Sequence, residues 1–259
     1  MSGAAAARWR TELEAWAIPE ELLAAAPESP YGFPVGMFEA DPEPADTPSR
    51  RHALEALPVG GTVLDVGCGG GAGAMALVPP ASAVVGVDSA PHMIEAFAAA
   101  AAARGVAHRE LLGSWPEVAT DAGTADVVLA HHVTYNVPDL APFALALDAA
   151  TRRRVVVEMT DVHPWVPTND LWLAFYGLDR PSGPSAALCA EVLTAAGFTV
   201  HSESWQRPAR RTDRAQTVAF VRRRLCLPVD AEPDVDAALP ADYQFASRSV
   251  TTLWWDSAQ

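Results

Sequence analysis

A glycine-rich stretch that contains an acid is the part of this chain best suited to chemistry. Residues 61–73 read Gly-Thr-Val-Leu-Asp-Val-Gly-Cys-Gly-Gly-Gly-Ala-Gly. Apolar β-forming residues run into the glycines, and a helix-like run follows, so the stretch predicts a strand, a tight loop and a helix. Gly67, Gly69 and Gly71 have no Cβ, which lets backbone N–H groups come close to a ligand. We expect a nucleotide-like group at this loop.

Two acids at predicted strand ends narrow the choice of ligand. Asp65 lies two residues before the first loop glycine, where a carboxylate repels a pyrophosphate but attracts an ammonium or sulfonium group. The next apolar run ends at Asp88, about the separation at which nucleotide-binding βαβ units place a carboxylate on ribose hydroxyls. Ser89 is expected to cap the following helix, whose apolar face includes Met93.

This arrangement resembles the class I S-adenosylmethionine-dependent methyltransferases, whose first motif has the form acid-x-Gly-x-Gly-x-Gly. The resemblance covers residues 47 to about 222. It implies an S-adenosyl-L-methionine cofactor and methyl transfer to an O, N, C or S nucleophile of a small molecule. After the third strand the family often has an acid that binds adenine. Here Ser114 stands in its place, and Trp115 offers a stacking face.

The resemblance also implies a role for the helix before the first strand, because a basic residue there can meet the cofactor carboxylate in related enzymes. Arg50 or Arg51 is expected to do so here. The residues predicted to hold the cofactor are Asp65, Gly67, Gly69, Gly71, Asp88, Ser89, Met93, Ser114, Trp115, His131 and Arg50.

Two adjacent histidines follow the predicted fourth strand. In an open parallel sheet, ligands lie outside the carboxyl ends of the strands where the strand order reverses, so this loop should face the methyl group. A hydroxyl acceptor needs a general base, whereas an amine acceptor needs none. His131 or His132 is the first choice, followed by His163 and Glu158 near the end of the fifth strand. Since successive strand side chains point to opposite faces, only one of the paired histidines is expected to reach the site.

The elements that position these residues predict one α/β domain. We expect a Rossmann-like, three-layer fold with a seven-stranded, mostly parallel sheet, an antiparallel last strand and an N-terminal helical lid. The last hairpin is expected from residues 198–205 and 217–221. Residues 1–46 would form the lid and connector, 47–227 the methyltransferase domain, and 228–259 a C-terminal extension that packs back on it. The N-terminal helices would cover the ligands or pack beside the sheet, and the aromatic stripe at 172–176 would bind substrate or pack.

Composition excludes several other classes of protein. The chain has 259 residues, is half apolar and carries a net charge of −14, with every basic residue an arginine. Such an acidic surface repels nucleic acid, and the arginine clusters at 152–154 and 222–224 are interpreted as solvated strand edges. Three widely spaced cysteines indicate neither disulfides nor a metal site. With neither a secretory signal pattern nor an apolar run of membrane-spanning length, we expect a cytoplasmic protein with no membrane or nucleic-acid partner.

Two alternatives remain at this level. A nicotinamide-dependent oxidoreductase uses the same βαβ unit, and Gly67-x-Gly69-x-x-Ala72 satisfies the loose form of its fingerprint. Asp65 is poorly placed for that cofactor, however, and a chain without lysine has no Tyr-x-x-x-Lys pair. The second alternative binds the cofactor without catalysis, or acts on macromolecules. The fourth strand lacks the Asn-Pro-Pro-aromatic motif of base-amino methyltransferases, and no Pro-Cys nucleophile of cytosine-C5 enzymes is found. Both absences favour a small acceptor.

Overall fold

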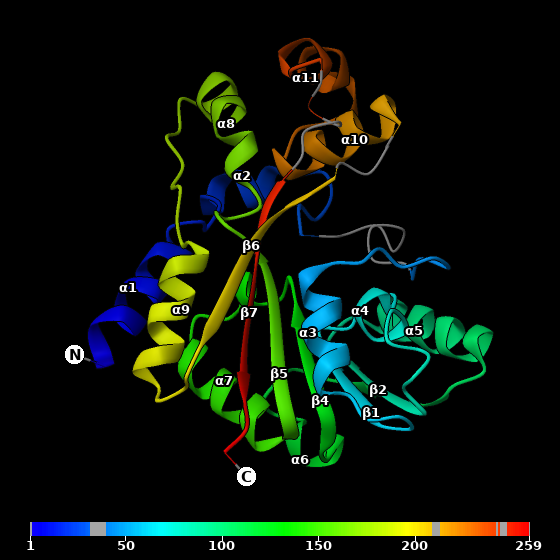
Figure 1. Cartoon of the computed structure of the whole chain (residues 1–259). Coiled ribbons are helices and arrows are strands. Elements are labelled where there is room, and N and C mark those ends of the chain that lie inside the picture. The colour runs from blue at the N-terminus through cyan, green and yellow to red at the C-terminus, as the bar shows by residue number, and fades with distance from the viewer. Residues whose placement is uncertain (1, 32–39, 209–212, 242, 244–247, 259) are drawn as a thin grey trace.

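One seven-stranded sheet organises the chain, in the order β3-β2-β1-β4-β5-β7-β6 (Figure 1). The computed structural model describes residues 2–31, 40–208, 213–241, 243 and 248–258. The first five strands are parallel, and β7 is antiparallel to both β5 and β6. The strands are β1 (Thr62–Val66), β2 (Ala83–Asp88), β3 (Ala107–Leu112), β4 (Ala125–His131), β5 (Thr151–Thr160), β6 (His201–Arg207) and β7 (Arg248–Asp256). The predicted Rossmann-like fold is confirmed.

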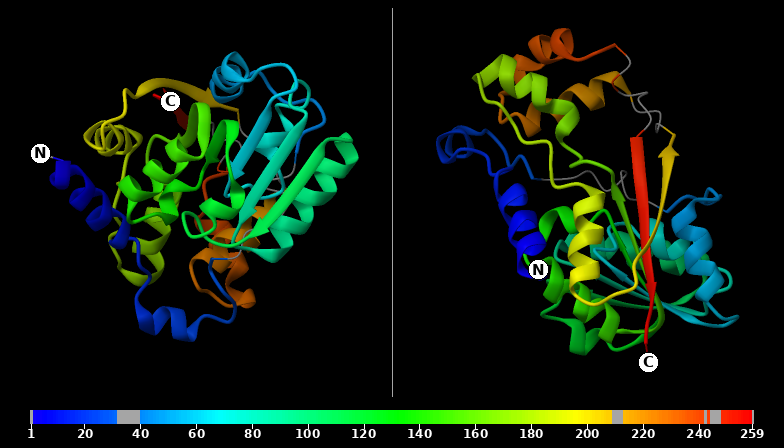
Figure 2. Two further views of the ribbon diagram at one scale, coloured as in Figure 1. Left: turned by 90° about the horizontal axis from the view of Figure 1, so that it is seen from below. Right: turned by 60° about the vertical axis from the view of Figure 1, so that its left-hand side comes forward.

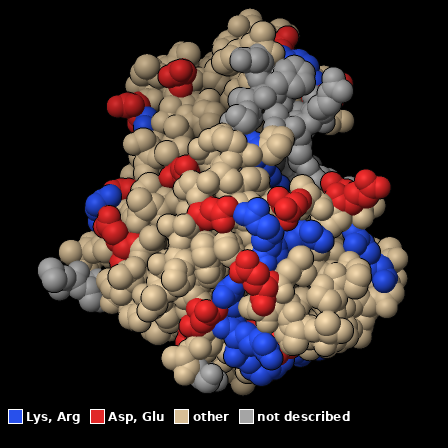
Figure 3. All heavy atoms as spheres, viewed as in Figure 1, with Lys and Arg blue, Asp and Glu red and all other residues tan. Residues whose placement is uncertain are grey.

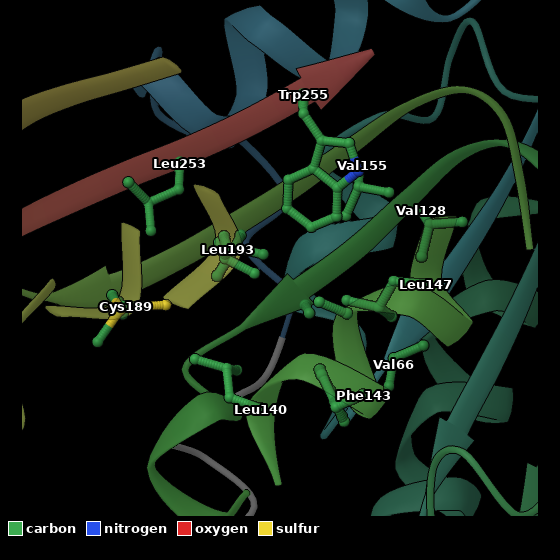
Figure 4. Close-up of a cluster of buried hydrophobic side chains, with 14 of the residues drawn as sticks. Val66, Val128, Leu140, Phe143, Leu147, Val155, Cys189, Leu193, Leu253 and Trp255 are labelled. Atoms are coloured by element: carbon green, nitrogen blue, oxygen red, sulfur yellow. The ribbon is translucent and has the colours of Figure 1, made fainter. Parts of the chain in front are cut away.

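Helices cover both faces of the sheet, as the two views in Figure 2 show. On one face α1, α7 and α9 enclose the largest apolar cluster, in which Val66, Val128 and Trp255 are fully buried (Figure 4). On the other face α3, α4 and α5 cover Val63, Val84 and other strand residues. These helices are α1 (Ser2–Glu14), α3 (Pro48–Ala56), α4 (Ala72–Met75), α5 (Pro91–Arg104), α7 (Leu140–Ala149) and α9 (Ala186–Ala195), with the short α6 (Ala119–Ala122) after β3.

The remaining helices form a cap, which lies above the sheet in Figure 1. The cap consists of α2 (Glu20–Ala25), α8 (Asn169–Tyr176), α10 (Arg214–Arg224) and α11 (Glu232–Ala238). A third apolar cluster holds it together, with Trp172 and Leu225 at its centre. Tyr176 Oη donates to the Leu225 carbonyl oxygen at 2.6 Å. The aromatic stripe at 172–176 therefore packs inside the cap, and α1 packs beside the sheet on α9.

The predicted last hairpin is wrong in its second strand. Residues 217–221 lie in α10, because Asp213 caps that helix by accepting hydrogen bonds from the backbone N–H groups of Ala215 and Gln216 at 2.7 and 3.2 Å. The strand that pairs with β6 is β7, in which Val250 and Leu253 are fully buried. Segment 228–259 thus supplies an inner strand of the sheet. Residues 32–39 of the predicted connector and 209–212 of the predicted turn lie outside the described residues.

The two arginine clusters have different surroundings. The interpretation of 222–224 as a solvated strand edge is wrong, because Arg222 and Arg224 are buried at the end of α10. Arg222 pairs with Glu28, and the Arg224 guanidinium lies 4.6 Å from the Trp165 ring centroid. In the other cluster, Arg154 pairs with acids of β7 and α3, and Figure 3 shows acidic side chains among the arginines. Among the described helices, none is long and apolar enough to cross a bilayer.

Candidate functional site

Four titratable side chains meet at the carboxyl ends of neighbouring strands. Val63 of β1 packs under α3–α5, and strand side chains alternate between faces, so Asp65 lies on the same side of the sheet. The same alternation places Asp88, His131 and Glu158 there, at the ends of β2, β4 and β5. His131 lies directly opposite Glu158 in the β4–β5 register. The strand order reverses between β1 and β4, as the sequence predicts.

The glycine loop after β1 requires glycine at named positions. Gly67, Gly69 and Gly71 have φ angles of +69°, +50° and +87°, in the left-handed region that side chains rarely adopt. A Cβ on Gly67 would lie 2.2 Å from Cγ2 of Val133, in the loop after β4. The Gly69 N–H donates to Asp88 Oδ2 at 3.0 Å. The loop is therefore fixed between the ends of β2 and β4.

The Asp88 carboxylate shapes the loop and the start of α5. Its Oδ1 accepts a hydrogen bond from the Ala90 N–H at 2.9 Å. The expectation that Ser89 caps this helix is wrong, since Ala90 is the N-cap residue and Ser89 is exposed. Met93 is buried on α5. Each carboxylate oxygen has more than one lone pair, so Asp88 keeps acceptor capacity for the hydroxyls of a ribose.

Asp65 is buried, and half-buried His131 lies near it in the site. Asp65 Oδ2 accepts from the Ala74 N–H at 2.9 Å. Burial raises the pKa of Asp65 to about 6, against the opposing charge of His131. A Cβ on Gly73 would lie 3.1 Å from both the Asp65 carboxylate and His131 Nδ1, so Gly73 packs closely against both groups. Burial lowers the pKa of His131, and its Nε2 is buried without a hydrogen-bond partner among the described residues. Such an orphaned atom fits a site that a polar ligand completes.

His132 departs from the strand alternation. Its φ is +58°, and its Nε2 lies 3.0 Å from Glu158 Oε1 and 2.7 Å from Arg207 Nη1. The expectation that only one of the paired histidines faces the site is therefore wrong, because the left-handed turn brings the second imidazole to Glu158 as well. Burial alone would raise the pKa of Glu158, but the His132 contact, the charge of His131 and the Ser49 hydroxyl hold it well below its usual range.

Four further candidates occupy different surroundings. Ser114 is exposed just after β3. Trp115 donates its indole N–H to the Phe143 carbonyl oxygen at 3.3 Å and packs against the core. Arg50 Nε donates to the Ala76 carbonyl oxygen at 2.9 Å, next to α4, whereas Arg51 pairs with Glu203 on β6. Of the two arginines, Arg50 is the one beside the glycine loop and its helix.

His163 lies in an aromatic cluster. Its ring stacks on Trp16 at a centroid distance of 4.0 Å, and Trp165 meets it edge-on at 5.6 Å. Burial, with the charges of Arg180 and Arg224, lowers the pKa of His163 to about 3. An imidazole with so low a pKa is a poor general base near neutral pH. The geometry therefore favours the histidines beside Glu158.

The polar contacts around Glu158 were not predictable from local sequence patterns. Ser49 of α3 donates to Glu158 Oε2 at 2.5 Å, and its hydroxyl lies 2.7 Å from that of Thr252 on β7. Arg207 comes from the end of β6. These residues are far apart in the chain, and no local spacing marks them. In the described part of the chain, no three His, Cys, Asp or Glu side chains gather as a metal site.

Comparisons with known proteins agree with this geometry. A family model described as a methyltransferase domain matches residues 63–153. Nocamycin O-methyltransferase from Saccharothrix syringae is 37% identical over 115 residues, which are 42% of this chain and 41% of that protein. The chain thus spans about two fifths of the length of this curated relative.

Solved structures share the fold at low sequence identity. The YcgJ protein from Bacillus subtilis matches with a TM-score of 0.56 and 18% identity, over 82% of this chain and 98% of that one. The cyclopropane synthase MmaA2 from Mycobacterium tuberculosis matches with a TM-score of 0.55 and 13% identity, over 96% and 98%. The segment that matches a methyltransferase domain, residues 63–153, includes the glycine loop and the paired histidines, and this part of the chain is similar to known methyltransferases.

Proposed function

We propose that this protein transfers a methyl group from S-adenosylmethionine to a nucleophilic atom of a small molecule. The observation that carries the proposal is the left-handed glycine loop flanked by Asp65 and Asp88 at the ends of two adjacent parallel strands. The relative from Saccharothrix syringae is named an O-methyltransferase, which favours an oxygen atom as the acceptor. Nitrogen, carbon and sulfur remain the other candidates.

The residues of the site suit this cofactor. When bound, S-adenosylmethionine supplies a methyl group on a sulfonium, which is already an activated leaving group. Asp88 would accept hydrogen bonds from the ribose hydroxyls, and Asp65 would face the positive charge of the amino acid part. Arg50 would meet its carboxylate. The protein then has mainly to align the acceptor and exclude water, and the cap above the sheet is placed to do so.

A pair of fluorescence titrations separates the proposal from its main alternative. The eight tryptophans of the chain supply the signal. We expect S-adenosylhomocysteine to give a saturable change and NADH to give none. Saturable binding of NADH alone would favour the oxidoreductase and reject the methyltransferase. Incubation with methyl-labelled cofactor and fractionated small molecules would then identify the acceptor by its gain in mass.

Cofactor binding is expected to weaken as Asp65 gains a proton. Because the pKa of this carboxyl is about 6 in the free protein, affinity for the cationic cofactor should fall about tenfold between pH 7 and pH 5. Asp65→Asn is the control, and its affinity should stay nearly constant over this range. The idea fails if Asp65→Asn keeps the same pH dependence as the unmodified protein. Calorimetry at several pH values makes the measurement.

Asp65 is expected to make the stability of the free protein decrease as the pH rises, whereas cofactor affinity increases. Its folded pKa is raised above the unfolded value of 3.8. The contribution of this carboxyl to folding is therefore fully present below the unfolded pKa and is lost as pH rises through about 6. Saturating cofactor should reduce this loss, because the cofactor stabilises the ionised form.

The paired histidines are the proposed source of a general base. For a hydroxyl acceptor, His132→Ala should lower kcat by about 10²- to 10⁴-fold, since no other group would take the proton at that position. His108→Ala, on the outer strand β3, should leave kcat unchanged. Steady-state kinetics with the identified acceptor provide the comparison. Unchanged turnover in both His131→Ala and His132→Ala would show that neither histidine is the general base.

A further inference from the structure

Nε2 of His132 has one neighbour that can only donate hydrogen bonds and one that can only accept them. Arg207 Nη1 lies 2.7 Å from His132 Nε2, and Glu158 Oε1 lies 3.0 Å from the same atom. A guanidinium only donates hydrogen bonds, and a carboxylate only accepts them. When Arg207 donates to Nε2, the neutral imidazole carries its proton on Nδ1. When Nε2 carries the proton, it donates to Glu158. The two contacts are therefore alternatives.

A chain of hydroxyl groups holds Glu158 in place. The Trp205 indole N–H donates to Thr252 Oγ1 at 3.3 Å, Thr252 contacts Ser49 at 2.7 Å, and Ser49 donates to Glu158 Oε2 at 2.5 Å. Since an indole only donates and an ionised carboxylate only accepts, both hydroxyls must point toward Glu158. The chain joins β6, β7, α3 and β5. Hydrogen-bonding groups from three other elements thus hold the Glu158 carboxylate in position.

Arg207 is the partner free to move. Its side chain is 38% exposed, against 8% for Glu158. It is the last residue of β6, and its Nη1 is 3.7 Å from Glu158 Oε1, longer than a hydrogen bond. Release of Arg207 from His132 therefore gives up only this long ion pair and leaves the contacts of Glu158 with His132 and Ser49 in place. An anion at the site would draw the guanidinium away, because its planar donors match a negatively charged oxygen.

The negative charge around the site means that an acidic acceptor needs a neighbouring cation such as the Arg207 guanidinium. Asp65, Asp88 and Glu158 lie on the same face of the sheet, and the chain has a net charge of −14. Without a neighbouring cation, a developing oxyanion beside these carboxylates would be repelled. Arg207 supplies positive charge next to the nitrogen that takes the proton.

We propose that the methyl acceptor carries an acidic hydroxyl, a phenol or an enol, that Arg207 moves to its oxygen, and that its O–H takes the place of Arg207 at Nε2 of His132, which then acts as the base. In this step the O–H bond of the acceptor breaks, its electron pair stays on the oxygen, and the proton forms an N–H bond at Nε2. The imidazolium is then paired with Glu158 and the oxyanion with Arg207. The proposal rests on the proposed function, because it concerns the acceptor of the same site.

Nitrogen NMR of the full chain labelled with ¹⁵N-histidine tests the proposal without methyl transfer. His132 is assigned from the signal lost in His132→Gln. In the free protein its proton is expected on Nδ1. In Arg207→Leu the proton should move to Nε2, since Glu158 is then the remaining partner. Arg153→Leu, an exposed arginine at the other end of the sheet, should match the unmodified protein. A proton on Nε2 in the free protein, or an unchanged tautomer in Arg207→Leu, overturns the proposal.

Titration with a phenolate completes the test. We expect 4-nitrophenolate to move the proton of His132 from Nδ1 to Nε2 in the unmodified protein, and 4-nitroaniline, a neutral molecule of the same shape, to leave it on Nδ1. Arg207→Leu should show no response to either. Equal responses to the two molecules, or none, reject an acidic acceptor. Because the cofactor titrations are separate, failure here and failure of the proposed function are distinguishable.

Discussion

Gly67→Ala is expected to abolish measurable cofactor binding and to lower the free energy of unfolding by about 2–4 kcal/mol. The new Cβ would lie 2.2 Å from Val133, and the φ of +69° disfavours any side chain. Val133 follows His132 directly, so relief of the clash displaces both loops of the site. Urea unfolding and titration with S-adenosylhomocysteine measure the two effects.

Gly105→Ala is the control that distinguishes the effect of backbone strain from that of the clash with Val133. Gly105 also has a left-handed φ, +63°, but a Cβ there meets nothing within 4 Å, and it lies at the far end of α5. We expect this variant to lose about 1 kcal/mol and to bind the cofactor normally. If Gly67→Ala loses no more stability than Gly105→Ala and still binds, the glycine loop does not form the site described above.

Asp88→Ala should weaken cofactor binding at least about 100-fold. The change removes the acceptors proposed for two ribose hydroxyls, each worth about 1.5 kcal/mol or more for a charged acceptor. It also removes the bonds that Asp88 accepts from the Gly69 and Ala90 N–H groups, which fix the shape of the loop. Calorimetry with S-adenosylhomocysteine gives the affinity.

Glu95→Ala is the matched control for this change. Glu95 is an exposed carboxylate on the same helix, α5, one turn after its start. We expect its affinity to equal that of the unmodified protein. An Asp88→Ala variant that binds within a fewfold of Glu95→Ala would show that no ribose is held at this position.

Local pattern was sufficient for the first half of the fold. The run from β1 through the glycine loop to β2 combines strand residues with glycines that only a tight loop uses, so each local signal agrees with the others. Residues 217–221 lack such agreement, because a short apolar run suits a strand or a helix equally. The Asp213 side chain, as the N-cap residue of α10, stabilises the helix here. The position of β7 depends on pairing with β5, about one hundred residues earlier in the chain.

The site was predictable where it follows strand ends. Asp65, Asp88 and His131 lie where parallel strands stop, so alternation alone brings them together. The left-handed turn at His132 was not predictable, since a non-glycine residue adopts it only when tertiary contacts compel it. The contacts of Glu158 with Ser49 and Arg207 join distant segments and leave no local pattern.

A crystal structure with S-adenosylhomocysteine bound tests the central claim most directly. We expect ribose hydroxyls within hydrogen-bond distance of Asp88 and backbone N–H groups of the glycine loop in contact with the ligand. A ligand bound elsewhere, or Asp88 turned away from the sugar, would contradict it.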